Sequence, residues 1–214
     1  MRSFFFAPAI LAAIVNCSSV QPVNKYDNCE KITIGAGTED FALSGDGSTI
    51  YVSSHERRGW KVPGEIYSFN IKSRQVKKLA RSGEPADLFF APHGIDIFAK
   101  NGEKFLYVVN HGKEMNDADQ SIVIYRMVGD ALSFVARVRS EFINSPNDVA
   151  VAENGSFYVT NDHGSRGSLW EVFWGLRRSG IAYCTLADLG ATNAKATCAL
   201  AAEGLAMANG PIVR

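Results

Sequence analysis

The sequence lacks three features that would indicate a function class directly: an excess of one charge, a long hydrophobic run and a familiar catalytic motif. Its 22 Lys and Arg residues balance 22 Asp and Glu residues. Nucleic-acid-binding domains usually carry a basic excess, so we expect no nucleic-acid partner. The longest apolar stretch, Phe4 to Val15, is too short to cross a bilayer as a helix, and we expect no transmembrane segment. Nucleophile-elbow, zinc-protease, phosphate-loop and EF-hand patterns are all missing.

Cysteine is scarce, and its spacing excludes the common metal and redox motifs. The four cysteines form no C-x-x-C pair and show no zinc-type spacing with histidine. Cys184 and Cys198 are 14 residues apart and could form a disulfide, whereas Cys29 has no obvious partner. One or two disulfides are the usual expectation for an exported chain.

The N-terminus has the pattern of an export signal. Arg2 precedes the apolar stretch, whose length is typical of a signal-peptide core. We therefore expect a signal peptide over 1–17, a linker over 18–28, and a secreted, periplasmic or cell-envelope location. Leu11 to Cys17 loosely resembles a bacterial lipoprotein box, although Asn16 occupies the position of a small residue. A lipid anchor and a disordered tail remain the alternatives.

The rest of the chain repeats with a period of about 54 residues. Each unit has a short apolar strand, a turn that contains glycine, and a second strand rich in aromatic and β-branched residues. Further strands are expected at Glu65 to Ile71, Ser121 to Met127 and Leu169 to Trp174. Four strands per unit indicate an all-β fold, a β-propeller, with a β-sandwich as the alternative. The units open at Glu39, His93 and Asn147, and a fourth opens at Asn209.

The repeat places polar residues where the innermost strands of a propeller would converge. Burying such side chains without partners is costly, so packing alone does not explain them. Calcium takes six to eight oxygen ligands, whereas zinc would require more than one histidine. The pattern therefore favours a calcium site, with a water-filled polar channel as the alternative. The oxygen-bearing residues are Glu39, Asn147 and Asn209, followed by Asp40 and Asp148.

Two histidines belong to the same repeat unit and could act in proton transfer. His93 opens the unit, and His111 follows its second strand, after Tyr107-Val108-Val109-Asn110. Histidine titrates near neutral pH, and a second histidine can orient the first or relay its proton. A structural role for either is equally compatible with the sequence. His55 is interpreted as a surface residue, and the cluster over 116–119 as a solvated loop.

These segments together resemble the paraoxonase/arylesterase family of calcium-dependent six-bladed propellers, which hydrolyse aryl esters and lactones. The resemblance runs from about Cys29 to the C-terminus. The motifs that carry it are Thr38-Glu39-Asp40, Pro92-His93-Gly94-Ile95, Val108-Val109-Asn110-His111, Pro146-Asn147-Asp148-Val149, Thr160-Asn161-Asp162-His163, and Glu203-Gly204 with Ala208-Asn209-Gly210.

The resemblance implies two calcium ions and a set of ligands for each. Glu39, Asn147 and Asn209 match ligands of the catalytic ion. Asp40, Asp148 and the backbone carbonyl of Ile95 match those of the structural ion. His93 matches the general base and His111 its partner, in attack by water on the carbonyl of a small ester or lactone. These implications make the chain a carboxylic ester hydrolase.

The sequence departs from the family pattern in its extent. Six units would need about 324 residues, whereas 29–214 holds three units and the start of a fourth, a partial propeller. The family's later Asp-Asn ligand pair and the partner of Cys29 have no match here. We expect a truncated chain or fragment, with possible self-association through open sheet edges. The alternative functions are a non-catalytic calcium-stabilised binding module and a gluconolactonase-like sugar-lactone hydrolase.

Overall fold

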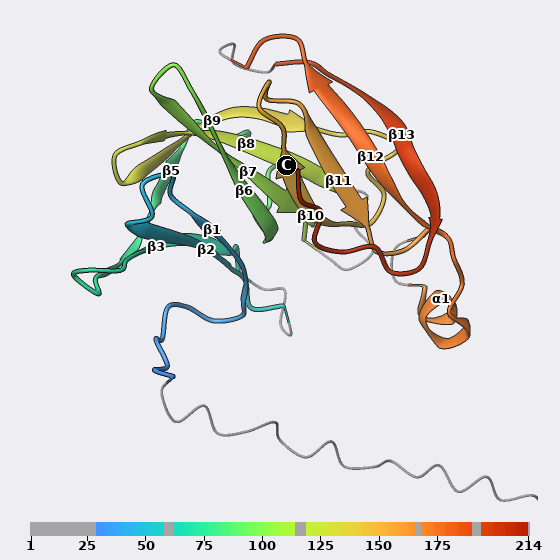
Figure 1. Cartoon of the computed structure of the whole chain (residues 1–214), viewed down its shortest axis with the longest axis horizontal. Coiled ribbons are helices and arrows are strands. Elements are labelled where there is room, and N and C mark those ends of the chain that lie inside the picture. The colour runs from blue at the N-terminus through green and yellow to red at the C-terminus, as the bar shows by residue number, and fades with distance from the viewer. Residues whose placement is uncertain (1–28, 58–61, 114–118, 166–167, 190–193, 214) are drawn as a thin grey trace, which may run out of the picture. The chain divides into compact units, whose positions relative to one another are not determined.

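The structure is a computed structural model that describes residues 29–57, 62–113, 119–165, 168–189 and 194–213 (Figure 1). Residues 34–214 form one unit, which contains every strand described below. The expected signal peptide and linker, 1–28, lie outside the described residues. In the part that is described, no helix has the length and apolar character needed to cross a membrane.

The first sheet consists of four antiparallel strands in sequence order, which is the pattern expected for one repeat unit. Its first hairpin closes through Asp46, whose carboxylate accepts hydrogen bonds from the hydroxyl groups of Ser44 and Ser48. The predicted strand at Glu65 to Ile71 is confirmed as β3. The strands are β1 (Thr38–Leu43), β2 (Thr49–Ser54), β3 (Glu65–Asn70) and β4 (Val76–Lys78).

The second and third sheets repeat this meander. In the second sheet, β5 adds a parallel edge strand beside β9, and the order is β5-β9-β8-β7-β6. The third sheet has the order β10-β11-β12-β13. The predicted strand at Ser121 to Met127 is confirmed as β8. The strands are β5 (Ala80–Ser82), β6 (Pro92–Lys100), β7 (Glu103–Asn110), β8 (Ser121–Val128), β9 (Ala131–Val138), β10 (Pro146–Val151), β11 (Phe157–Asn161), β12 (Ser179–Leu186) and β13 (Ala196–Leu205).

The strand predicted at Leu169 to Trp174 is wrong, because this segment is a short helix, α1 (Leu169–Trp174). The strand after β11 is instead β12, which pairs with β11 along its length, from Phe157 opposite Cys184 to Asn161 opposite Gly180. The segment between β11 and β12 is therefore not needed as a strand of the sheet, and part of it forms α1. The helix ends at Gly175, which adopts the left-handed conformation (φ 59°) that glycine favours.

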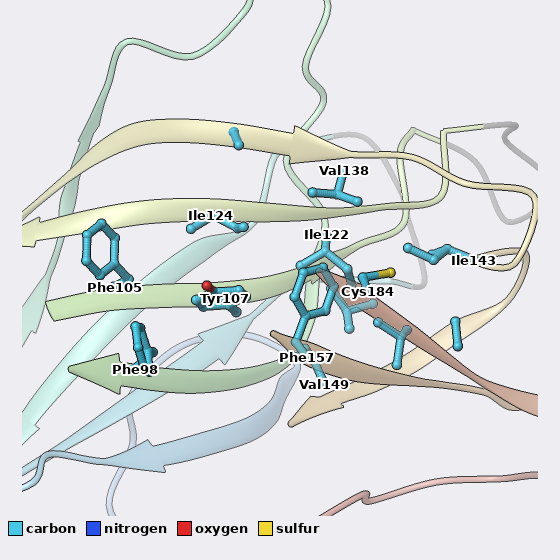
Figure 2. Close-up of a cluster of buried hydrophobic side chains, with 14 of the residues drawn as sticks. Phe98, Phe105, Tyr107, Ile122, Ile124, Val138, Ile143, Val149, Phe157 and Cys184 are labelled. Carbon is cyan, nitrogen blue, oxygen red and sulfur yellow. The ribbon is translucent and has the colours of Figure 1, made fainter. Parts of the chain in front are cut away.

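Two hydrophobic clusters lie between neighbouring sheets. One joins the first and second sheets through residues such as Ile66, Leu106 and Val108. The other joins the second and third sheets, where the rings of Tyr107 and Phe157 meet edge to face with centroids 5.4 Å apart (Figure 2). Each sheet thus packs face to face on the next one along the chain.

The first strand of the second sheet, β6, contacts the first strands of both neighbouring sheets, β1 and β10. In a β-propeller, successive sheets pack so that their first strands contact one another in a row, whereas a sandwich has only two layers. The sandwich alternative is therefore wrong. The predicted all-β, propeller-type fold is confirmed. The number of blades in a complete ring stays a prediction.

One disulfide is present among the described residues, between Cys184 on β12 and Cys198 on β13. The two residues lie directly opposite each other in the ladder. The expected pairing of these cysteines is therefore confirmed. Cys29 is exposed and has a free thiol.

Candidate active site

The site begins with a bulge that recurs in the first strand of every sheet. The register shifts between Thr38 and Phe41 in β1, and it shifts again at Pro92/Ile95 in β6 and Pro146/Asp148 in β10. A regular strand alternates its side chains between two faces, and a bulge interrupts this alternation. Two successive residues of each strand can therefore face the same pocket.

A pocket of about 110 Å³ lies where the three bulges meet. Six of the eight residues predicted for the site line it, and the structure thus brings together groups that are far apart in the sequence. The remaining two, Ile95 and His111, lie behind the lining. The pocket residues are Glu39, Asp40, His93, Gly94, Asn147, Asp148 and Asn209.

A chain of hydrogen bonds runs from the pocket into the second sheet. Glu39 Oε2 lies 3.0 Å from His93 Nε2, and His93 Nδ1 lies 3.0 Å from His111 Nε2. His111 is buried at the end of β7, and its Nδ1 lies 3.0 Å from Gln120 Oε1. The amide of Gln120 also donates from Nε2 to the carbonyl of His111 at 2.9 Å. Gln120 therefore holds His111 by both its ring and its backbone.

The orientation of Gln120 fixes the protons along this chain. Its Oε1 can only accept, so Nδ1 of His111 carries a proton, and neutral His111 offers the lone pair of Nε2 to His93. His93 Nδ1 is then a donor. Its Nε2 can donate to an ionised Glu39 only when the His93 ring carries both protons. The hydrogen bond from His93 also lowers the pKa of Glu39.

Three aspartates crowd beneath the histidines. Burial, and then the charge of Asp40, raise the pKa of Asp148 to about 7. Burial, with Asp40 again, also raises the pKa of Asp96. A cation would offset the repulsion among these carboxylates.

The oxygen donors fit a calcium ion in their chemistry. Carboxylates from Glu39, Asp40 and Asp148 and amides from Asn147 and Asn209 line one pocket, and hard oxygen ligands are what calcium takes. Among the described residues, no three His, Cys, Asp or Glu side chains already stand in metal-binding geometry. The donor set depends on the two amides as well as on the acids.

The aspartates also connect neighbouring sheets. Asp40 Oδ2 of the first sheet accepts the backbone N–H of Ile95 in the second sheet at 2.8 Å. Asp96 Oδ2 of the second sheet accepts the N–H of Val151 in the third at 2.7 Å. Asp40 therefore both lines the pocket and connects the first sheet to the second, whereas Asp96 connects the second sheet to the third.

Three residues of the site were missed by the sequence analysis. At the 54-residue period Asp96 matches Ala42 and Ala150, which are not polar, so the repeat gives no signal for it. Arg57 and Gln120 occupy no repeated position, and the sequence offers no signal for either. Arg57 Nη1 lies 3.2 Å from Glu39 Oε1.

The prediction that His55 lies on the surface is wrong. The residue directly follows β2, its exposed fraction is 2%, and its ring meets Phe89 edge to face at 6.2 Å. Burial lowers the pKa of His55.

The prediction that residues 116–119 form a solvated loop is also wrong for Asp119. Asp119 is largely buried and pairs with Arg137 and with Arg139, the latter at 3.0 Å. Residues 116–118 lie outside the described part of the chain.

Comparisons with known proteins identify a family. A family model described as "Arylesterase" matches residues 29–209. Serum paraoxonase/arylesterase 1 of Rattus norvegicus is 29% identical over 179 residues, which is 77% of this chain and 49% of the rat protein. Serum paraoxonase/lactonase 3 of Homo sapiens is 30% identical over 169 residues, 74% of this chain and 47% of the human protein.

A likeness among solved structures concerns the fold alone. A structure of the yeast heterotrimeric Nup82-Nup159-Nup116 nucleoporin complex shares 11% identity with a TM-score of 0.50, and the match covers 83% of this chain and 58% of that one. The chain spans about half the length of the curated relatives it matches. On the strength of the family match and its coverage, the chain belongs to the arylesterase family.

Proposed function

We propose that the chain is a secreted, calcium-dependent carboxylic ester hydrolase that acts on aryl esters and lactones. The observation that carries this proposal is the line of hydrogen-bonded groups from Glu39 through His93 and His111 to Gln120, which ends at a pocket of oxygen donors. Membership of the arylesterase family supports the reaction class. The serum relatives support a secreted protein.

We assign the proposed ligands to two ions. Glu39, Asn147 and Asn209 would hold a catalytic calcium ion. Asp40, Asp148 and the carbonyl of Ile95 would hold a structural one. A bound calcium ion polarises a substrate carbonyl and stabilises the negative charge that develops on its oxygen.

His93 is the proposed general base. Without its contact to Glu39, neutral His93 presents the Nε2 lone pair to the pocket, where it can take a proton from an attacking water. His111 accepts the hydrogen bond from Nδ1 of His93 and keeps the ring oriented. Gln120 in turn fixes the tautomer of His111.

The test compares an aryl acetate with a lactone, each with and without a chelator, for the parent chain and for His93→Gln. We expect turnover that the chelator abolishes and that His93→Gln lowers by about 10²- to 10⁴-fold, the usual contribution of a general base. Circular dichroism and calcium titration of the variant control for folding and for an intact metal site.

Other outcomes would identify the alternatives. Folded protein that binds calcium and hydrolyses neither substrate would support a non-catalytic binding module. A strong preference for hydrophilic sugar lactones would support a gluconolactonase-like activity.

We also propose that residues 29–214 form part of a six-bladed ring and associate with a second copy. Apolar side chains are exposed on the outer sheets, including Phe41 and Leu43 on β1 and Leu200 on β13. Exposed apolar strands invite pairing with another chain. Light scattering tests this proposal, and a strictly monomeric folded species would contradict it. A lipid anchor, tested by mass spectrometry of the mature N-terminus, is the alternative to simple secretion.

A further inference from the structure

Both oxygens of the Glu39 carboxylate are engaged by cationic or proton-donating groups of the chain. His93 Nε2 contacts Oε2 at 3.0 Å, and Arg57 Nη1 contacts Oε1 at 3.2 Å. Glu39 is also one of the residues proposed to hold the catalytic calcium ion. The same carboxylate therefore has an alternative partner within the protein.

Arg57 is poised for this role by its surroundings. It lies three residues beyond the end of β2, and its side chain is 30% exposed, as is that of Glu39. Among the described residues its Nε and Nη2 atoms are buried without a hydrogen-bond partner, and Glu39 is its ion-pair partner. Asp162, which directly follows β11, lies near enough to interact electrostatically with the guanidinium. The positive charge is thus held beside Glu39, a residue that lines the acidic pocket.

A guanidinium and a divalent cation compete when they bind the same carboxylate oxygen. An ion that binds Oε1 of Glu39 must break its pair with Arg57, and an ion at either oxygen must bind beside a positive charge. Both effects weaken binding of the ion, by an amount that depends on the local screening.

We propose that Arg57 competes with calcium for Glu39 and thereby weakens calcium binding at this site. The inference rests on the proposed function, because it takes Glu39 to be a calcium ligand. Arg57 is a positioning residue: through Glu39 it also holds His93 in the contact that engages its Nε2 atom. Removal of Arg57 should free Glu39 for the ion.

The test uses Arg57→Gln, with Arg57→Lys to retain the charge and Arg126→Gln as a matched control. Arg126 Nε pairs with Glu103 Oε1 at 3.0 Å, and its side chain is 34% exposed, close to the values for Arg57. Glu103 begins β7, whereas His111 follows the opposite end of that strand. The control pair is therefore more than about 20 Å from the histidines, at the usual rise per residue of a strand.

Calcium affinity is measured by isothermal titration, and terbium luminescence provides a second readout that does not depend on hydrolysis. We expect Arg57→Gln to lower the calcium Kd about three- to tenfold, the range expected for loss of a partly exposed ion pair and of one nearby charge. Arg57→Lys and Arg126→Gln should stay within about twofold of the parent chain. The rise in melting temperature on adding calcium should be larger for Arg57→Gln than for the parent.

An unchanged or higher Kd for Arg57→Gln would overturn the inference, as would an equal change in Arg126→Gln. If neither the parent chain nor Arg57→Gln binds calcium, the inference fails together with the calcium part of the proposed function. If Arg57→Gln binds more tightly but no variant hydrolyses an ester or lactone, the inference stands and the hydrolase proposal fails.

Discussion

At the scale of single residues, Gly94 shows how closely the pocket walls approach each other. A Cβ atom at this position would lie 2.3 Å from Asp148 Oδ1, 2.5 Å from Asp148 Cα and 2.7 Å from the carbonyl oxygen of Asn147. Two of these three atoms belong to the backbone of β10, so the clash cannot be relieved by a side-chain rotation. Glycine is therefore required where β6 passes β10.

We expect Gly94→Ala to destabilise the protein by about 1–3 kcal/mol, the usual cost of overpacking, because β6 and β10 must separate. Gly45→Ala is the control, since a Cβ there meets nothing within 4 Å. Urea denaturation of both variants measures the difference. Equal stability of the two variants would contradict the close packing at Gly94.

Asp46 gives a prediction about pH. Its carboxylate accepts hydrogen bonds from Ser44 Oγ and from the backbone and hydroxyl of Ser48, and the bond from Ser44 contributes most to lowering its pKa from 3.8 to about 2. A carboxyl whose pKa is lower in the folded state stabilises the fold above its unfolded pKa, and this contribution is lost as pH falls through the folded pKa.

The melting temperature of Asp46→Ala should therefore lie below that of the parent chain at neutral pH, and the gap should narrow as the pH falls from about 4 towards 2. Thermal melts over this range provide the measurement. A gap that stays constant down to pH 2 would mean that the charge of Asp46 does not stabilise the turn.

At the scale of secondary-structure elements, α1 is held to the protein by one buried acid. Glu171 is 4% exposed, and its carboxylate accepts the backbone N–H groups of Gly164 at 2.8 Å and Ser165 at 3.3 Å. The other large side chains of the helix are exposed. Apolar packing therefore contributes little to its attachment.

Glu171→Ala should cost about 1–3 kcal/mol of stability, because it leaves two N–H groups without their acceptor. Hydrogen exchange should speed up at Gly164 and Ser165 while β11 and β12 keep their protection. Glu153→Ala, on an exposed turn, is the control. Unchanged exchange at Gly164 and Ser165 would contradict the assigned attachment.

Sequence reasoning predicted the elements that repeat and failed where local chemistry is ambiguous. The hairpins repeat a strand–turn–strand pattern with glycine in the turn, so their existence and the convergence of Glu39, His93 and Asn147 followed from spacing. Leu169–Trp174 is rich in residues that strands favour, and only the direct pairing of β11 with β12 shows that no strand is needed there. The burial of His55 depends on Phe89, a residue distant in the sequence. A contact between residues distant in the sequence cannot be predicted from the residues that flank His55.

At the scale of the whole molecule, the site joins parts that no single sheet contains. The three sheets are bridged by Asp40 to Ile95 and by Asp96 to Val151, and three acids meet in the middle. An ion held by the proposed ligands would contact groups from every sheet, including the backbone carbonyl of Ile95 in the second. Its removal should therefore affect the packing between sheets more than the strands within them.

We expect a chelator to lower the melting temperature and added calcium to restore it, because a ligand that binds only the folded state stabilises it. Magnesium at the same concentration is the control, since it demands a smaller and more regular coordination shell. Identical melting curves with chelator, calcium and magnesium would contradict a structural ion at this junction.

Because the first strand of each sheet is bulged, two neighbouring residues of that strand face the pocket. Redesign of the pocket can therefore treat such residues as pairs. Glu39-Asp40, His93-Gly94 and Asn147-Asp148 each contribute neighbouring side-chain positions to the same pocket. Exchanging Glu39-Asp40 or Asn147-Asp148 would alter two neighbouring positions of the cavity, whereas Gly94 must remain glycine and leaves only His93 to vary in the second pair. An engineer seeking a new activity on this framework would do best to vary the first and third pairs two residues at a time.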